Sequence, residues 1–180
     1  MKRFLLSIVG VLLGLAVFYL LPEEGRQGRQ GRNQASRPVP AEAPVSVPSA
    51  GEEWSETDPA VNLAHVFEGD INRRGKPVGF HSRPGGTDPA GARVVRRISG
   101  PNALGVYIAE VEIRNRRKTS TFFPDSMSRE EVVAAILHAW EERRDLGGDK
   151  FQGPSGEGFT IEGYTLDGGG INTAYPLYKR

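Results

Sequence analysis

The pattern of apolar and polar residues divides this chain of 180 residues into three parts. Residues 4–21 form an uncharged, apolar run that is long enough for a membrane-spanning helix or the core of a signal peptide. Residues 23–60 are rich in Pro, Gly and Arg and lack periodic apolar positions, which predicts a disordered linker. Apolar residues recur at regular spacing over residues 61–180, and we expect this part to form one domain.

The apolar run follows a short basic start, so residues 1–22 are expected to be a signal anchor or a signal peptide with a hydrophobic helix over residues 4–21. No pair of small residues at cleavage-site spacing follows the run, which favours an uncleaved anchor. Arginines lie on both sides of it, and the positive-inside rule therefore does not decide its orientation. The resemblance of the basic start to an export signal places the remainder outside the cytoplasm, anchored in the membrane or secreted if the N-terminus is cleaved.

Alternation with a period of two predicts strands in the third part of the chain. They are expected over residues 94–98, 106–113, 119–123, 159–166 and 171–175. A basic turn over residues 114–118 joins two of them, and a glycine-rich connection over residues 167–170 makes a hairpin of the last two. Residues 62–67 are expected to form a short helix, followed by a stretch dominated by loops over residues 75–91.

One clear helix is predicted between these strands. Ser128 and Glu131 form a capping box at its start, and the helix is expected to run from residue 129 to about residue 144, with Gly147 and Gly148 ending it. His138 lies opposite the apolar stripe of this helix and is expected at the surface. One central helix with four or five antiparallel strands indicates an α+β domain.

Composition narrows the chemistry. The chain has no cysteine, which excludes a disulfide framework, a thiolate zinc site and a cysteine nucleophile. The formal net charge is only +1, but basic residues cluster between residues 73 and 118. This clustering suits an anionic partner such as nucleic acid, or simply a solvated charged face. The residues concerned are Arg73, Arg74, Lys76, Arg83, Arg93, Arg96, Arg97, Arg114, Arg116, Arg117 and Lys118.

Two of the three histidines, His65 and His81, stand close together in sequence, each near glycine and charged residues. Histidine can gain or lose a proton near neutral pH. A metal site would need a third ligand, and although Glu68 and Asp70 are near His65, no HExxH or comparable helical spacing is present.

Two further uses of these histidines remain. A Ser-His-Asp set can be assembled from Ser82, His81 and Asp88, but no Gly-x-Ser-x-Gly sequence surrounds any serine. Alternatively, His65 and His81 can form a general acid and base pair, supported by nearby cations that stabilise developing negative charge. RNA suits this chemistry because its own 2′-hydroxyl is the nucleophile.

Several segments identify a resemblance to the bacterial EndoU nuclease domain, which often forms the C-terminal part of polymorphic toxins. They are HVFEGDIN at residues 65–72, GFHS at 79–82, GVY at 105–107, VEI at 111–113, KTSTFFP at 118–124 and GINTAYP at 170–176. The resemblance covers residues 62–178 in the family's order, and leaves out the first sixty residues.

The resemblance implies cleavage of single-stranded RNA or tRNA, typically at uridine, leaving a 2′,3′-cyclic phosphate. It implies that His65 and His81 share the acid and base roles and that Lys118 steadies the phosphate. Thr173 and Tyr175 would position the phosphate and the uracil. No cofactor or metal ligand is implied beyond weak stimulation by a divalent cation. The implied fold is a compact antiparallel-sheet nuclease domain of the barnase, EndoU and colicin type.

Alternatives remain for individual residues and for the whole domain. His65 could be a structural histidine, Arg116 or Arg117 could act in place of Lys118, and Tyr175 could serve only in sheet packing. The chain could also be a catalytically idle, membrane-tethered module that binds RNA or protein. A toxin role would add an immunity protein as partner, and a housekeeping RNase is the alternative to that role. DNA is not an expected substrate.

Overall fold

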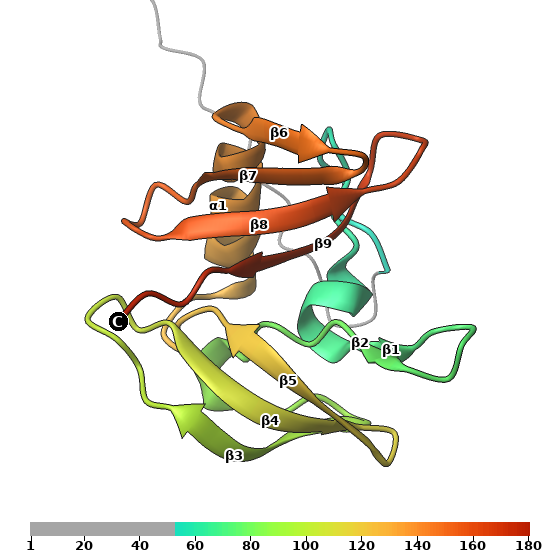
Figure 1. The fold of residues 1–180 in the computed structure, drawn as a ribbon, viewed down its shortest axis with the longest axis vertical. Coiled ribbons are helices and arrows are strands. Elements are labelled where there is room, and N and C mark those ends of the chain that lie inside the picture. Colours follow the sequence, from blue (N-terminus) through green and yellow to red (C-terminus); the bar gives the residue numbers. More distant parts are fainter. Residues whose placement is uncertain (1–52) are drawn as a thin grey trace, which may run out of the picture. The chain divides into compact units, whose positions relative to one another are not determined.

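The computed structural model describes residues 53–180, which form two larger antiparallel sheets, a two-stranded sheet and one α-helix (Figure 1). The three-stranded sheet has the order β3 (Ala92–Ser99), β4 (Tyr107–Ile113) and β5 (Arg116–Phe122). The four-stranded sheet has the order β6 (Arg144–Gly147), β7 (Lys150–Pro154), β8 (Thr160–Thr165) and β9 (Ile171–Pro176). The α-helix is α1 (Arg129–Glu141). The expected α+β class is confirmed, with more strands than the four or five predicted; the likeness to barnase and colicin nucleases stays a prediction.

Short elements connect the start of this region to the sheets. A π-helical turn, η1 (Ala64–Glu68), replaces the helix expected over residues 62–67. The loop-dominated stretch contains the paired strands β1 (Asp70–Ile71) and β2 (Pro77–Val78) and the 3₁₀ turn η2 (Pro84–Gly86).

The helix α1 begins as predicted and ends earlier. The Ser128 side chain accepts a hydrogen bond from the Glu131 backbone, and the Glu131 side chain accepts one from the Ser128 backbone, which confirms the capping box. The expectation that the helix continues to about residue 144 is wrong, because the apolar stripe runs out and residues 141–149 are exposed. Gly147 ends β6 and Gly148 follows it in the connection to β7; both adopt positive φ, and neither terminates the helix.

Helix α1 packs closely on the four-stranded sheet. A Cβ atom on Gly153 would lie 1.9 Å from the Ala139 carbonyl oxygen, so only glycine permits this approach of strand and helix. Phe151, Ile161 and Ala174 are buried in the same cluster as the apolar residues of α1. The opposite face of the sheet is left to polar side chains, because successive strand residues point to opposite faces.

The turn between β4 and β5 differs from the prediction. Arg114 and Asn115 alone form the turn, both with positive φ (46° and 66°), and Arg116 begins the next strand. The expected basic turn over residues 114–118 is therefore wrong. Extending β5 by three residues places Lys118 inside a strand, opposite Val111, and so gives it a defined position.

The two larger sheets meet at β5 and β9, and η1 contacts β9 at the same place (Figure 1). A second buried cluster packs on the three-stranded sheet and contains Phe80, Tyr107 and Phe122. The junction of β5, β9 and η1 gathers residues from widely separated parts of the sequence, and the predicted site residues lie there.

The apolar run of residues 4–21 lies outside the described residues, as does the predicted linker up to residue 52. Within residues 53–180, no helix has the length and apolar character needed to cross a membrane. The last residues assigned to the linker lie against the domain: the Ser55 hydroxyl accepts a hydrogen bond from the Val61 amide at 2.7 Å, and Trp54 pairs with Asn62.

Candidate active site

The five predicted site residues come from four places in the chain. His65 lies in η1, His81 in the extended segment after β2, and Lys118 in β5. Thr173 and Tyr175 lie in β9, two residues apart and therefore on one face of that strand. The His81 and Tyr175 rings are stacked with centroids 5.1 Å apart, and both histidines feel the charge of Lys118. The structure thus brings the predicted residues to one region.

Gly79 joins three parts of this region. Its carbonyl oxygen accepts a hydrogen bond from the Lys118 ammonium at 2.8 Å. Gly79 has φ +71°, and a Cβ atom there would lie 2.2 Å from the His65 carbonyl oxygen. That oxygen accepts a hydrogen bond from the Phe80 amide at 2.8 Å, and the His81 amide donates to the Val66 carbonyl at 2.7 Å. The glycine therefore lets the segment bearing His81 lie directly on the turn bearing His65.

His81 is held in one tautomer. The imidazole is buried, and its Nδ1 lies 2.9 Å from the Thr121 carbonyl oxygen. A carbonyl can only accept, so Nδ1 must carry the proton and donate it. Nε2 is then the nitrogen that can exchange a proton with a substrate, as a general acid or base requires.

Burial lowers the pKa values of the three basic residues in this region. Burial and the nearby Lys118 charge lower the pKa of His65 to about 4, against an opposing effect of Asp70. Burial and Lys118 also hold the pKa of His81 well below its ordinary value, although the Thr121 carbonyl favours its charged form. Burial lowers the pKa of Lys118 to about 8, so Lys118 is predominantly charged at pH 7 while both histidines are neutral.

The charge of Lys118 has no protein counter-ion in the described part of the chain. Its ammonium donates to a backbone carbonyl, and among residues 53–180 it lies within ion-pair distance of no carboxylate. Of the cations that could act on the phosphate, Lys118 is favoured over its two neighbours, because Arg117 pairs with Glu112 and Arg116 is exposed. A half-buried cation without a counter-ion is suited to an anionic ligand such as a phosphate.

Sequence reasoning missed a carboxylate that supports Tyr175. The Tyr175 hydroxyl donates to Glu162, a buried residue on the neighbouring strand β8. Lys150 contacts the same carboxylate at 2.8 Å and Gln152 donates to it at 2.9 Å. Although burial raises it, these hydrogen bonds hold the pKa of Glu162 below its ordinary value, so the ionised carboxylate fixes the Tyr175 ring against His81.

The basic cluster proves to be largely neutralised by the protein itself. Five exposed arginines on the three-stranded sheet and its turns pair with carboxylates: Arg93 with Glu112, Arg96 with Glu110, Arg97 with Asp125, Arg114 with Asp70, and Arg117 with Glu112. Of the two interpretations of this cluster, these pairs favour the solvated charged face for that sheet. The cation in the site itself is Lys118.

Two other chemistries are not assembled by the structure. His81 Nδ1 is committed to Thr121, Asp88 pairs with Arg83 at 2.8 Å, and the buried Ser82 hydroxyl has no hydrogen-bond partner, so no Ser-His-Asp chain forms. Within residues 53–180, no three His, Asp or Glu side chains are grouped as ligands for a metal ion. His138 is exposed on α1, as predicted, and donates to or accepts from no site residue.

Comparison with known proteins agrees with this arrangement. The family model described as bacterial EndoU nuclease matches residues 60–178. A Bacillus cereus protein named "Toxin" is 34% identical over 123 residues, which cover 63% of this chain and 22% of that relative. The chain thus matches only about a fifth of the length of that curated relative. No solved structure matches the chain significantly. The extent of the family match, which includes the histidines, the lysine and the β9 pair, shows that this chain belongs to the bacterial EndoU nuclease family.

Proposed function

We propose that this chain is an endoribonuclease that cleaves single-stranded RNA at uridine by transesterification. The observation that carries the proposal is the convergence of His65, His81 and the unneutralised Lys118 where β5 meets β9. This set supplies two proton-exchanging groups and one cation. It contains no protein nucleophile, and RNA requires none because its 2′-hydroxyl attacks the adjacent phosphorus.

The proposed reaction needs two proton transfers. One imidazole takes the proton of the 2′-hydroxyl as the 2′-oxygen bonds to phosphorus. The bond from phosphorus to the 5′-oxygen breaks, and the other imidazole, in its protonated form, gives a proton to that oxygen. The products are a 2′,3′-cyclic phosphate and a 5′-hydroxyl. The Lys118 ammonium stabilises the negative charge that builds up on the non-bridging oxygens.

Thr173 and Tyr175 are proposed to position the substrate. The Thr173 hydroxyl is buried without a hydrogen-bond partner, so it has unused capacity for a phosphate oxygen or a uracil edge. Tyr175 is held by Glu162 beside His81 and offers an aromatic surface next to the reacting groups. Uridine preference would follow from these contacts to the base.

The biological setting is proposed from the family and the relative. The toxin-named relative supports a role as a toxin domain, and an immunity protein that covers the site is then the expected partner. We place the nuclease domain outside the cytoplasm, held at the membrane by residues 4–21 or secreted after cleavage. Single-stranded RNA or tRNA is the proposed substrate, and no cofactor is required beyond weak stimulation by a divalent cation.

The test uses two oligonucleotides that differ by one oxygen. The purified protein is incubated with RNA containing a single uridine and with the same strand carrying deoxyuridine there, each with and without EDTA. We expect cleavage of the first strand alone, resistance to EDTA, and a 2′,3′-cyclic phosphate at the new end. Equal cleavage of both strands would refute the mechanism. Binding of both strands without cleavage of either would instead support an idle RNA-binding module.

A further inference from the structure

The polar face of the four-stranded sheet continues well beyond the histidines. Strand pairing places Tyr175 opposite Glu162, Glu162 opposite Gln152, and Gln152 opposite Arg144, so these four side chains form one row across the sheet. Three strand spacings separate Tyr175 from Arg144, about 14 Å in all. Arg144 therefore stands at the far end of this row, beyond the residues that hold Tyr175.

The row is connected by hydrogen bonds. Arg144 donates to the Gln152 oxygen at 2.5 Å, and the Gln152 amide nitrogen donates to Glu162 at 2.9 Å. Glu162 in turn accepts from the Tyr175 hydroxyl. Although Arg144 is exposed, its guanidinium therefore has a preferred place on the sheet, on the face that also carries the stacked Tyr175 ring.

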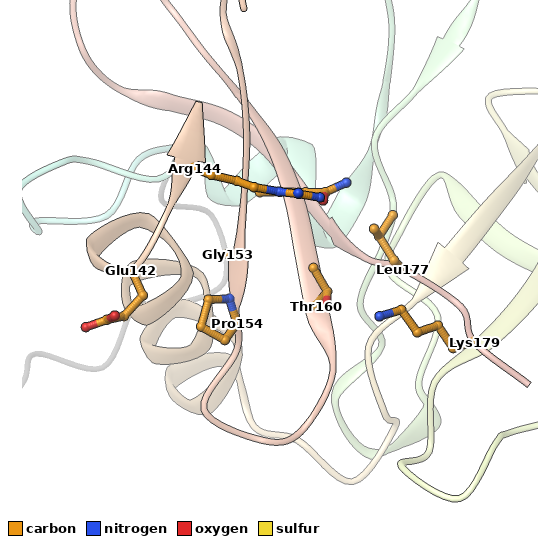
Figure 2. A pocket seen from close by; sticks show the side chains of 8 residues that line it. Glu142, Arg144, Gly153, Pro154, Thr160, Leu177 and Lys179 are labelled. Atoms are coloured by element: carbon orange, nitrogen blue, oxygen red, sulfur yellow. The ribbon is translucent and has the colours of Figure 1, made fainter. Parts of the chain in front are cut away.

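A hollow of about 520 Å³ lies beside this row (Figure 2). It is lined by Glu142, Arg144, Gln152, Gly153, Pro154, Thr160, Leu177 and Lys179. Figure 2 shows Arg144 and Lys179 on different sides of the hollow, with Thr160 between them. The two cations outnumber the one carboxylate of its lining, Glu142, and Pro154 and Leu177 add apolar surface.

Lys179 is held at this hollow although it is the last residue but one. Its carbonyl oxygen accepts a hydrogen bond from the Asn102 side chain at 2.8 Å, and the Leu177 amide donates to the Thr160 carbonyl at 2.8 Å. The C-terminal segment is thus tied to the end of β8. Both cations are exposed, and Lys179 makes no ion pair in the described part of the chain.

We propose that this hollow is a second nucleotide subsite, which binds a nucleotide outside the cleaved linkage. Arg144 and Lys179 contact its phosphates, and the amide and hydroxyl of Gln152 and Thr160 and the apolar surface of Leu177 contact its base or sugar. The inference rests on the proposed function, because it extends the same RNA strand from the histidines across the open face of the sheet. The ligand class is single-stranded RNA longer than a dinucleotide.

The test compares charge removal in the hollow with equal charge removal elsewhere. The double variant Arg144→Gln/Lys179→Gln is matched by Arg93→Gln/Arg96→Gln, which removes two exposed arginines from β3 on the other sheet. Binding is measured by fluorescence anisotropy with an RNA octamer whose single uridine is replaced by deoxyuridine, at several salt concentrations. Cleavage rates are measured on the dinucleotide UpA and on the uridine octamer.

We expect the hollow variant to bind the octamer roughly tenfold more weakly, with a logarithmic salt slope that is smaller by about 0.7 for each phosphate that the variant no longer neutralises. Its kcat/KM for UpA should stay within about twofold of the unaltered protein, because Lys150 still pairs with Glu162, and Glu162 still accepts from Tyr175, when Arg144 is replaced. The control variant should bind nearly as the unaltered protein does. Circular dichroism checks that both variants are folded, and Lys179→Gln alone should give a partial effect.

Three results would overturn the subsite: an octamer affinity that falls equally in both double variants, a decrease on UpA as large as on the octamer, or no octamer binding by the unaltered protein. Absence of RNA cleavage by the unaltered protein would count against the proposed function instead. The binding comparison remains readable in that case, because its oligonucleotide is one that is not cleaved.

Discussion

Substitution of Gly79 by alanine tests whether backbone packing, and not only the side chains, positions the two histidines. Two costs are expected. The first is backbone strain, because φ is +71° and an L-residue in the left-handed region costs about 1–2 kcal/mol. The second is steric, because the added Cβ would lie 2.2 Å from the His65 carbonyl oxygen and 2.7 Å from its ring.

The steric cost should be felt at the site. Relief of a 2.2 Å contact requires the two segments to separate by about 1 Å, which also stretches the hydrogen bond from Phe80 to His65. Overpacking of this kind costs about 1–3 kcal/mol of folding free energy. A displacement of about 1 Å between reacting groups lowers an enzymatic rate roughly a hundredfold. The expected total is about 2–5 kcal/mol of stability and a decrease of about two orders of magnitude in kcat.

Gly85 supplies the matched control. It has nearly the same φ, +67°, but a Cβ there would meet no atom within 4 Å. Gly85→Ala should therefore incur only the strain of about 1–2 kcal/mol and keep its activity. Urea unfolding gives both stabilities, and initial rates on a uridine-containing RNA are measured where each variant is folded. Equal stability and activity of the two variants, or a destabilised Gly79→Ala with full activity, would refute the positioning role.

The other predictions concern the imidazoles, the pH profile and attachment. His65→Ala and His81→Ala should each lower kcat by roughly two to four orders of magnitude, whereas His138→Ala should be nearly silent; an active, folded variant of either site histidine would remove that residue from the mechanism. The kcat/KM profile should be bell-shaped with its maximum on the acid side of neutral, because the pKa of His65 is about 4 and that of His81 is also depressed. The rate should fall further above about pH 8, where Lys118 loses its charge. A rate that rises without limit to high pH would indicate a metal-bound hydroxide instead. Full-length protein should remain with membranes through a high-salt wash if residues 4–21 are an uncleaved anchor, and release by salt would contradict the anchor.

One feature of the site, the pairing of Glu162 with Tyr175, is predictable from local sequence. The sequence predicts the hairpin of β8 and β9 and its connection over residues 167–170. Equal steps outward from that connection place Glu162 opposite Tyr175, which is the observed pairing. A carboxylate facing a tyrosine in a strand otherwise rich in apolar residues is therefore a signal that local sequence contains. Its significance depends on knowing that Tyr175 also meets His81, which comes from a segment nearly a hundred residues earlier.

Other features cannot be predicted from local sequence. Residues 141–149 contain a single large apolar residue, Leu146, and show no alternation, so nothing within them predicts strand β6. That strand forms because β7 supplies its hydrogen-bonding partner, and β7 in turn is fixed by β8. The subsite proposed at Arg144 cannot be predicted from the sequence for the same reason. Arg144 is expected at the end of a helix and lies instead on the open face of the sheet.

The depressed pKa values of both histidines have a consequence for how the reaction starts. Near neutral pH the free protein holds two neutral imidazoles, either of which can serve as a base, while the proposed reaction also needs one protonated imidazole.

A phosphodiester bound beside Lys118 brings a negative charge into a region that burial has removed from water, and a nearby negative charge raises the pKa of an imidazole. Binding of the substrate therefore promotes uptake of the proton that the leaving group later receives. The same burial that leaves the free protein with little protonated imidazole strengthens this effect, because the interaction between phosphate and imidazolium is less screened there than in water. On this reasoning the active protonation state belongs to the complex with RNA, and kcat should peak at a higher pH than kcat/KM does.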